Sequence, residues 1–341
     1  MNRILSVASL AAGVILAGLP PASAQAPSAK AINTGGPQGA YHSLFCPPVP
    51  VALGGAYFQG YACTPSRGTV ENIERVLATP SQLGFAQLDV YAREAARRPE
   101  EFRRLTLIRQ DLACEGLWMV TRNEQLTGFG DVLGLARRIP FILPAEGSGS
   151  AASFDFLMQN DPEGLGRAQP RNIRRMPDAT AVINAVAEST DGAVGFFVQF
   201  ADPQNANIRL MAEKGLKIIP VVSREILRTR VGDQAVYEVQ TFTLAGGGVF
   251  ARPRELTTAC TPVAIFGGAP ESLAVGKGVT QDDQRELIAK VRAIPAQRLL
   301  PQESRVAALI ANARRLSAGA ADQLAAAAET TKRAVERQFN N

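Results

Sequence analysis

Short apolar runs typical of buried β-strands alternate with helical patterns through the first third of the chain. The predicted strands are residues 30–33, 57–62, 84–87, 105–109 and 116–121. The predicted helices are residues 38–48, 69–78 and 89–97, and the prolines at 47, 48 and 50 are expected to end the first of them. Strands that alternate with helices predict an α/β protein.

The same alternation restarts beyond Thr121. Helices are predicted at residues 129–137, 151–159 and 177–187, and strands at 139–143, 193–198, 217–222, 237–244 and 258–266. The restart predicts two lobes, because one lobe begins, a second is inserted and the chain then returns to complete the first. Residues 31–121 and 242–300 are expected to form the first lobe and residues 122–241 the inserted one, with two crossover strands as the hinge.

The last part of the chain is expected to be helical. Thr280 is a candidate N-cap for a helix over 281–294. Beyond Pro301, an alanine-rich stretch carries apolar residues at helical spacing. We expect this C-terminal helical tail, residues 301–341, to pack across the lobes; a membrane or partner surface is the alternative.

Residues 1–24 have the pattern of a signal peptide. A positive start at Arg3 precedes an apolar stretch over 4–19, two prolines break it, and Ala22-Ser23-Ala24 offers small residues at a cleavage site. The apolar stretch is shorter than the roughly 20 residues of a spanning helix, so cleavage after Ala24 is favoured over a retained anchor. The mature protein is therefore expected in the periplasm.

Composition excludes some functions. The 341 residues are 46% hydrophobic and 20% charged, which is ordinary for a globular protein. The net charge of +5 is dispersed and aromatic residues make up only 6%, so the basic stripe with stacking aromatics of a nucleic-acid-binding protein is missing. His42 is the only histidine, and no metal-ligand spacing is present, so neither a metal nor another cofactor is predicted.

The four cysteines are expected to form disulfide bonds in an oxidising compartment. Four cysteines allow three pairings, and four buried free thiols are a further alternative. We prefer Cys46 with Cys63, which closes a short loop, and Cys114 with Cys260, which joins two predicted strand segments.

Four polar, glycine-bearing motifs lie where a predicted strand gives way to a helix. They are Thr34-Gly35-Gly36 with Gly39-Ala40-Tyr41-His42, Arg67-Gly68-Thr69-Val70-Glu71-Asn72, Gln87-Leu88-Asp89, and Gly147-Ser148-Gly149-Ser150. Small ligands bind at this edge of α/β proteins. Glycines let the backbone approach a ligand, and the N-terminus of a helix favours an anionic group.

The side chains of the motifs suit a small polar ligand. Thr69, Ser148 and Ser150 place hydroxyl groups at helix starts. Asp89 can accept a hydrogen bond from an ammonium or hydroxyl group, and Gln87 can donate or accept.

Each motif alone also has a structural explanation. Hydroxyl residues at helix starts are commonly caps, Asp89 can cap its own helix, and glycine loops are common turns. Tyr41 and His42 can cover an apolar part of a ligand, or His42 can be an ordinary surface residue. The combination of motifs over two lobes favours a convergent ligand site.

The motifs resemble those of the TAXI family, the extracytoplasmic solute-binding subunits of TRAP-type transporters. The family patterns TGG with GxYY, GSxxN, QxD and GSGT are matched in this order over residues 31–222, followed by the paired aromatics of Gly195-Phe196-Phe197. The resemblance implies a two-lobed periplasmic-binding-protein fold, type II-like, that closes on a small anionic or zwitterionic solute. The implied contacts are Thr34, Gly35, Tyr41, Thr69, Gln87, Asp89, Ser148, Ser150 and Phe197.

Some residues add to this pattern or depart from it. Gly36 and His42 of the first motif are added as candidate contacts, and Arg67 is the candidate partner for an acidic group of the solute. His42, Thr69 and Ser150 replace the tyrosine, serine and threonine of the family, so no particular ligand is implied. The cysteines and the sequence beyond Val222 lie outside the pattern.

These features predict a receptor that captures a carboxylate or amino acid and delivers it to a membrane transporter of the TRAP type. An ABC-type receptor, or a sensor for a signalling partner, is the alternative with the same fold. A secreted hydrolase fits less well, because the GxSxG elbow is absent around Ser148 and His42 would have to be its base. The chain is therefore not expected to be an enzyme.

Overall fold

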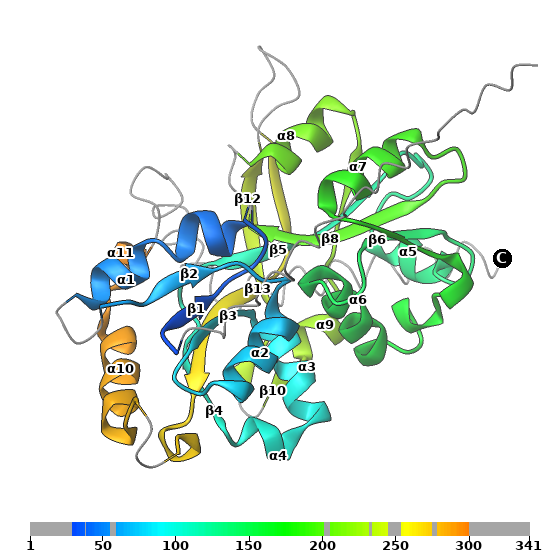
Figure 1. The fold of residues 1–341 in the computed structure, drawn as a ribbon. Coiled ribbons are helices and arrows are strands. Elements are labelled where there is room, and N and C mark those ends of the chain that lie inside the picture. Colours follow the sequence, from blue (N-terminus) through cyan, green and yellow to red (C-terminus); the bar gives the residue numbers. More distant parts are fainter. Residues whose placement is uncertain are drawn as a thin grey trace, which may run out of the picture.

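A mixed β-sheet of eleven strands runs through the described part of the chain (Figure 1). The computed structural model describes residues 29–37, 39–54, 59–200, 205–231, 234–244, 254–274 and 278–299. The signal peptide, the glycine run at 246–248 and the C-terminal helical tail expected from the sequence lie outside these ranges. Within them, no helix has the length and apolar character needed to cross a membrane.

The first group of strands is parallel. Strand β1 (Ala31–Asn33) pairs with β2 (Ala62–Thr64) on one side and with β3 (Leu83–Gln87) on the other. The helical segments between and after these strands are η1 (Tyr41–Phe45), α1 (Pro48–Leu53), α2 (Thr69–Ala78), α3 (Leu88–Arg97) and α4 (Pro99–Phe102). Helix α2 forms because Ile73 and Val76 recur at helical spacing and bury one face, while Glu71 and Glu74 occupy the other.

The second group of strands is also built around a parallel core. Strand β6 (Phe141–Pro144) pairs in parallel with β7 (Ile173–Met176) and β8 (Val194–Phe200). Its other elements are α5 (Phe129–Leu135), α6 (Gly149–Asn160), η3 (Leu165–Arg167), η4 (Pro170–Asn172), α7 (Ala179–Glu188), α8 (Ala206–Glu213), β9 (Lys217–Pro220) and α9 (Arg224–Arg228). A short hairpin follows, made of β10 (Arg230–Val231) and β11 (Gln234–Ala235).

Two long strands join the groups. Strand β13 (Arg254–Gly268) pairs antiparallel with β3 and β4 (Leu105–Arg109) through its second half. Its first half pairs antiparallel with β12 (Glu238–Leu244) and with β5 (Cys114–Thr121). Strand β5 in turn pairs antiparallel with β8 and β9. The chain then closes with η5 (Pro270–Ser272), α10 (Gln281–Ala293) and α11 (Ala296–Leu299). The α/β class and the two strand groups joined by crossover strands agree with the fold expected from the sequence.

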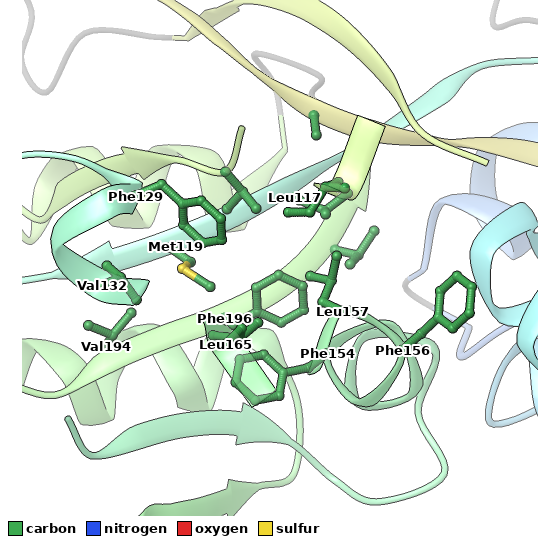
Figure 2. Close-up of a cluster of buried hydrophobic side chains, with 14 of the residues drawn as sticks. Leu117, Met119, Phe129, Val132, Phe154, Phe156, Leu157, Leu165, Val194 and Phe196 are labelled. Atoms are coloured by element: carbon green, nitrogen blue, oxygen red, sulfur yellow. The ribbon is translucent and has the colours of Figure 1, made fainter. Parts of the chain in front are cut away.

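Side-chain alternation along β5 directs its residues into two different cores. Leu117 and Met119 pack with Phe154 of α6 and Phe196 of β8 in one cluster, shown in Figure 2. Trp118, on the opposite face of β5, belongs to a cluster under α7 and α8. Because both faces of β5 are buried, its register is strongly constrained.

The sequence predicts many elements within one or two residues, but not the region after the first motif. The helix expected at 38–48 is present only as the short η1, and a second helix, α1, begins at Pro48, where the prolines were expected to end a helix. Proline is well tolerated at the first position of a helix, where its missing N–H group is not needed. The strand expected at 57–62 begins only at Ala62, and residues 55–58 are not described. Strand β7 and helices α8 and α9 were not predicted.

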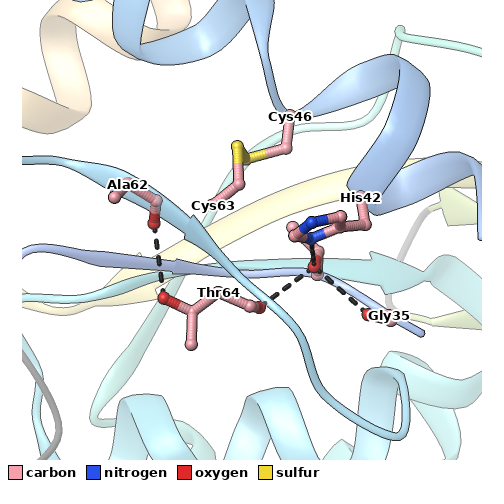
Figure 3. The surroundings of a disulfide bond; sticks show 7 residues. Gly35, His42, Cys46, Ala62, Cys63 and Thr64 are labelled. Atoms are coloured by element: carbon pink, nitrogen blue, oxygen red, sulfur yellow. Dashed lines mark hydrogen bonds between the residues drawn. A yellow bond between two sulfur atoms is a disulfide. The ribbon is translucent and has the colours of Figure 1, made fainter. Parts of the chain in front are cut away.

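Both disulfide bonds expected from the sequence are present in the preferred pairing. Cys46 is bonded to Cys63 beside the first motif (Figure 3), and Cys114 is bonded to Cys260. The second bond joins neighbouring residues of β5 and β13, the two strands that connect the groups. It therefore links segments 146 residues apart in sequence.

Replacing Cys114 and Cys260 together by alanine should destabilise the protein more than replacing Cys46 and Cys63. In the chain-entropy account the loops of 146 and 17 residues correspond to about 5 and about 3 kcal/mol of unfolding free energy. Urea unfolding of the two double variants measures the difference. Equal losses, or a greater loss for the short loop, would contradict the expectation.

Candidate functional site

All four polar motifs follow the carboxyl ends of strands that take part in parallel pairing. The first follows β1, the second follows β2, the third begins at the end of β3, and the fourth follows β6. Carboxyl ends of neighbouring parallel strands meet at one edge, so the first three motifs are neighbours. The fourth belongs to the other strand group and must reach them across the sheet.

The first motif is held by its own polar side chains. Thr34 is fully buried, and its Oγ1 lies 3.0 Å from Nδ1 of His42 and 3.0 Å from the carbonyl oxygen of Thr64 (Figure 3). The carbonyl oxygen of Gly35 accepts a hydrogen bond from the backbone N–H of Ser66 at 3.1 Å. Thr34 and His42 therefore fix the loop after β1 and attach it to the second motif.

The second motif begins α2 and connects the first to the third. Gly68 precedes the helix with a φ of 121°, a conformation that favours glycine. The side-chain oxygen of Thr69 accepts a hydrogen bond from the backbone N–H of Gln87 at 3.0 Å. Asn72 is fully buried and donates to the carbonyl oxygens of Thr34 and Phe85, which ties the ends of β1 and β3 together.

The fourth motif lies directly against the second and third. A Cβ atom placed on Gly149 would lie 1.9 Å from Oε1 of Gln87 and 2.9 Å from its Cδ. A Cβ on Gly68 would lie 3.5 Å from the backbone nitrogen of Gly149. The start of α6 therefore meets the end of β3 and the start of α2, so residues from both strand groups come together.

The two serines of the fourth motif are engaged locally. Ser148 is the N-cap of α6, and its side chain accepts a hydrogen bond from the N–H of Ala151 at 3.2 Å. The Oγ of Ser150 accepts from the N–H of Val198 at 3.0 Å, which attaches α6 to β8. These bonds orient the helix start.

Beneath this junction lies a buried carboxyl group that the sequence analysis did not identify. Glu115, on β5, is 6% exposed, and its Oε2 accepts a hydrogen bond of 2.6 Å from the hydroxyl of Tyr41. Burial raises the pKa of Glu115 from 4.5 to about 7; the hydrogen bond from Tyr41 opposes the rise and the Asp89 carboxylate adds to it. The side chain of Gln87 is a further hydrogen-bonding neighbour of Glu115.

Asp89 is a second buried carboxyl group at the same junction. It is fully buried, its Oδ2 accepts from the hydroxyl of Tyr237 at 3.0 Å, and its Oδ1 accepts from the N–H of Val90 at 2.8 Å. Burial raises the pKa of Asp89, and the hydrogen bonds that it accepts oppose the rise. The backbone N–H of Asp89 donates to Oγ1 of Thr261 at 3.1 Å, which attaches the start of α3 to β13.

The structure does not bring every candidate to this junction. The side chain of Arg67 is 85% exposed and forms an ion pair of 2.9 Å with Glu71, in the first turn of α2. Phe197 is fully buried in the cluster with Trp118, whereas Leu117, on the face of β5 that carries Glu115, belongs to another cluster. Thr34 accepts a hydrogen bond from Asn72 of the second motif, whereas His42 bonds to Thr34 and Gly36 accepts from the N–H of Gly39 within the first loop.

The site residues that were not predicted differ in whether the sequence offers a signal for them. Glu115 is the only charged residue of β5, whose eight residues are all buried, and an acidic residue within such a run is a recognisable anomaly. Tyr237 and Thr261 join the site only through contacts between segments far apart in sequence. No local pattern distinguishes them from ordinary strand residues.

The histidine and the serines of the motifs form local hydrogen bonds. Within the described ranges, no group of three or more histidine, cysteine or acidic residues is placed to hold a metal ion. His42, the only histidine, bonds to Thr34 in the first loop. Neither Ser148 nor Ser150 has an imidazole partner among its hydrogen bonds.

Comparisons with known proteins supply similar structures only. No protein-family model and no curated protein matches the chain. A possible phosphate binding protein from Planctomyces limnophilus is similar at 15% identity, 83% coverage of this chain, 97% of its own and a TM-score of 0.35. The ancestral amino acid-binding protein AncCDT-1, a precursor of cyclohexadienyl dehydratase, is similar at 11% identity. The match covers 86% of this chain and 93% of that chain, with a TM-score of 0.39.

A third similar structure is PhnD1 from Prochlorococcus marinus in complex with methylphosphonate. Its identity is 10%, with 78% of this chain and 84% of that chain covered, and the TM-score is 0.44.

Replacing Gly149 by alanine should disrupt the contact between the strand groups. The added Cβ would collide with the buried amide of Gln87, so we expect a loss of about 1–3 kcal/mol of unfolding free energy, typical of overpacking. Gly134→Ala is the matched control, because a Cβ there meets nothing within 4 Å and alanine favours the helix. Denaturant unfolding that finds Gly149→Ala as stable as the control would contradict the contact.

The raised pKa of Glu115 predicts a pH-dependent stability. The folded protein holds this proton more tightly than the unfolded chain, so the contribution is complete below pH 4.5 and is lost as pH rises to about 7. The slope is at most about 1.4 kcal/mol per pH unit for one group. Glu115→Gln, which resembles the protonated form, should flatten this slope in unfolding titrations from pH 5 to 8.

The raised pKa of Asp89 gives a contribution of the same sign above its ordinary pKa of 3.8. Glu188→Gln, on the exposed end of α7, should leave the profile of the parent protein unchanged. A profile of Glu115→Gln identical to the parent would show that Glu115 does not titrate in this range.

Proposed function

We propose that the protein is an extracytoplasmic solute receptor that binds a small molecule between its two strand groups and delivers it to a TRAP-type membrane transporter. The observation that carries this proposal is the contact of Gly149 with Gln87 and Gly68. Polar motifs from both groups meet there, each at the end of a strand. A site assembled from two groups can respond to a ligand by closing.

The strands β5 and β13 are the natural hinge for such closure. Strand β13 pairs with β3 of the first group and with β5, and β5 pairs with β8 of the second group, so a bend in these two strands changes the distance between the motifs. On the surface of the same junction, Arg93 of α3 lies 3.7 Å from Asp155 of α6. This ion pair between α3 and α6 can form only when the two strand groups are close together.

Export and the transporter type rest on the sequence. The signal peptide and the TAXI-like motifs favour a periplasmic receptor of the TRAP type, and two disulfide bonds suit an oxidising compartment. An ABC-type receptor or a sensor would share the binding step and differ in its partner. The partner's identity therefore separates these alternatives.

A thermal-shift screen of the mature protein, starting at Gln25, tests the proposal. The panel contains amino acids, amines, dicarboxylates, keto acids and inorganic anions. A ligand at one hundred times its dissociation constant should stabilise the protein by about 2.7 kcal/mol. Scattering profiles should then show compaction with the hit; the absence of any saturable hit would contradict a receptor.

The N-cap residues offer a matched test of the fourth motif. Ser148→Ala and Asp178→Ala each remove an N-cap and should each cost about 1 kcal/mol of stability. Only Ser148→Ala should also weaken binding of the screening hit, because Asp178 begins α7 outside the junction. Equal affinities of the two variants for the hit would exclude the fourth motif from the site.

A further inference from the structure

We infer that the solute recognised at this junction presents a cationic group, such as a protonated amine, to Glu115 and Asp89. This inference rests on the proposed function and specifies its substrate class. It differs from the expectation of an anionic or zwitterionic solute, whose acidic group would be bound by Arg67.

The two carboxyl groups converge on one residue of β13. Thr261 is the register partner of Glu115 across the β5–β13 pair. The hydroxyl of the same threonine accepts a hydrogen bond from the backbone N–H of Asp89. Glu115 and Asp89 therefore approach the junction from β5 and α3 on either side of Thr261, and each influences the same tyrosine, Tyr41.

No described base neutralises these carboxyl groups. The groups that shift the pKa of Glu115 and Asp89 within the described part of the chain include no arginine, lysine or histidine. The candidate bases are engaged elsewhere: Arg67 with Glu71, and Arg93 with Glu94 and Asp155. Buried carboxylates normally require charge compensation, so the site favours a positive partner from outside the chain.

The hydrogen-bonding groups also leave acceptor capacity for a ligand. Asp89 accepts hydrogen bonds from Tyr237 and from the N–H of Val90, and Glu115 accepts from Tyr41 beside Gln87, whereas each carboxylate can accept about four. The fully buried hydroxyl of Ser153 also lies beside Asp89 and opposes the rise of its pKa. An ammonium group supplies three donors and one positive charge, which suits this set of acceptors.

Three probes with four-carbon skeletons separate the charge classes. They are 1,4-diaminobutane, 4-aminobutanoate and butanedioate, added to the full mature chain in thermal-shift and calorimetric titrations. The diamine should give the largest saturable rise in Tm, the amino acid a smaller one and the dicarboxylate none. This ranking is measured on the parent protein and does not depend on a variant that folds.

Glu115→Gln then tests the assigned residue. Glutamine is close in size to the parent residue. The substitution should lower the affinity for the diamine by at least about tenfold, because a charge-assisted hydrogen bond becomes a neutral one. Glu188→Gln makes the same chemical change on the exposed end of α7 and should leave the affinity unchanged. An unaltered affinity in Glu115→Gln would overturn the assignment of Glu115.

Other outcomes distinguish this inference from the proposed function. Binding of butanedioate as tight as that of the diamine, or no response to any of the three probes, would overturn the cationic class. The proposed function would survive if the broad screen still found an anionic or neutral solute. A broad screen with no saturable hit would overturn the proposed function as well.

Discussion

Strand β13 is the constraint on which the rest of the structure depends, because it pairs with β3 of the first group and with β5, which in turn pairs with β8 of the second group. Its second half pairs with β3, so that Val263 lies opposite Gln87, and its first half pairs with β5, so that Thr261 lies opposite Glu115. One strand therefore fixes the distance between two polar residues that belong to separate parts of the sequence. The disulfide bond between Cys114 and Cys260 fastens this arrangement.

The burial of two carboxyl groups at this junction costs electrostatic free energy. Glu115 and Asp89 are buried and are not neutralised by a described base, and burial raises the pKa of both. Two apolar residues would pack there more favourably, so the carboxyl groups weaken the fold locally. Conflicts of this kind are expected at functional sites, where a ligand supplies what the chain lacks.

Local patterns predicted much of the fold and of the motifs, whereas the charge of the site depends on distant contacts. Helix α2 begins and ends where its apolar spacing indicates, and each motif follows a strand. Arg67 lies beside a motif in sequence, but Glu71, in the first turn of α2, pairs with it at the surface. Glu115 becomes a site residue only through the pairing of β5 with β13, which its own neighbours in sequence do not specify.

Hydrogen exchange with and without the screening hit tests most directly whether the two strand groups form one site. The account predicts that the ligand protects peptides over residues 68–72 and 147–151 together, because the start of α2 and the start of α6 close on the same molecule. Peptides at the distant end of α7 should be unaffected. Protection of only one of the two helix starts, or of neither, would contradict a site shared between the groups.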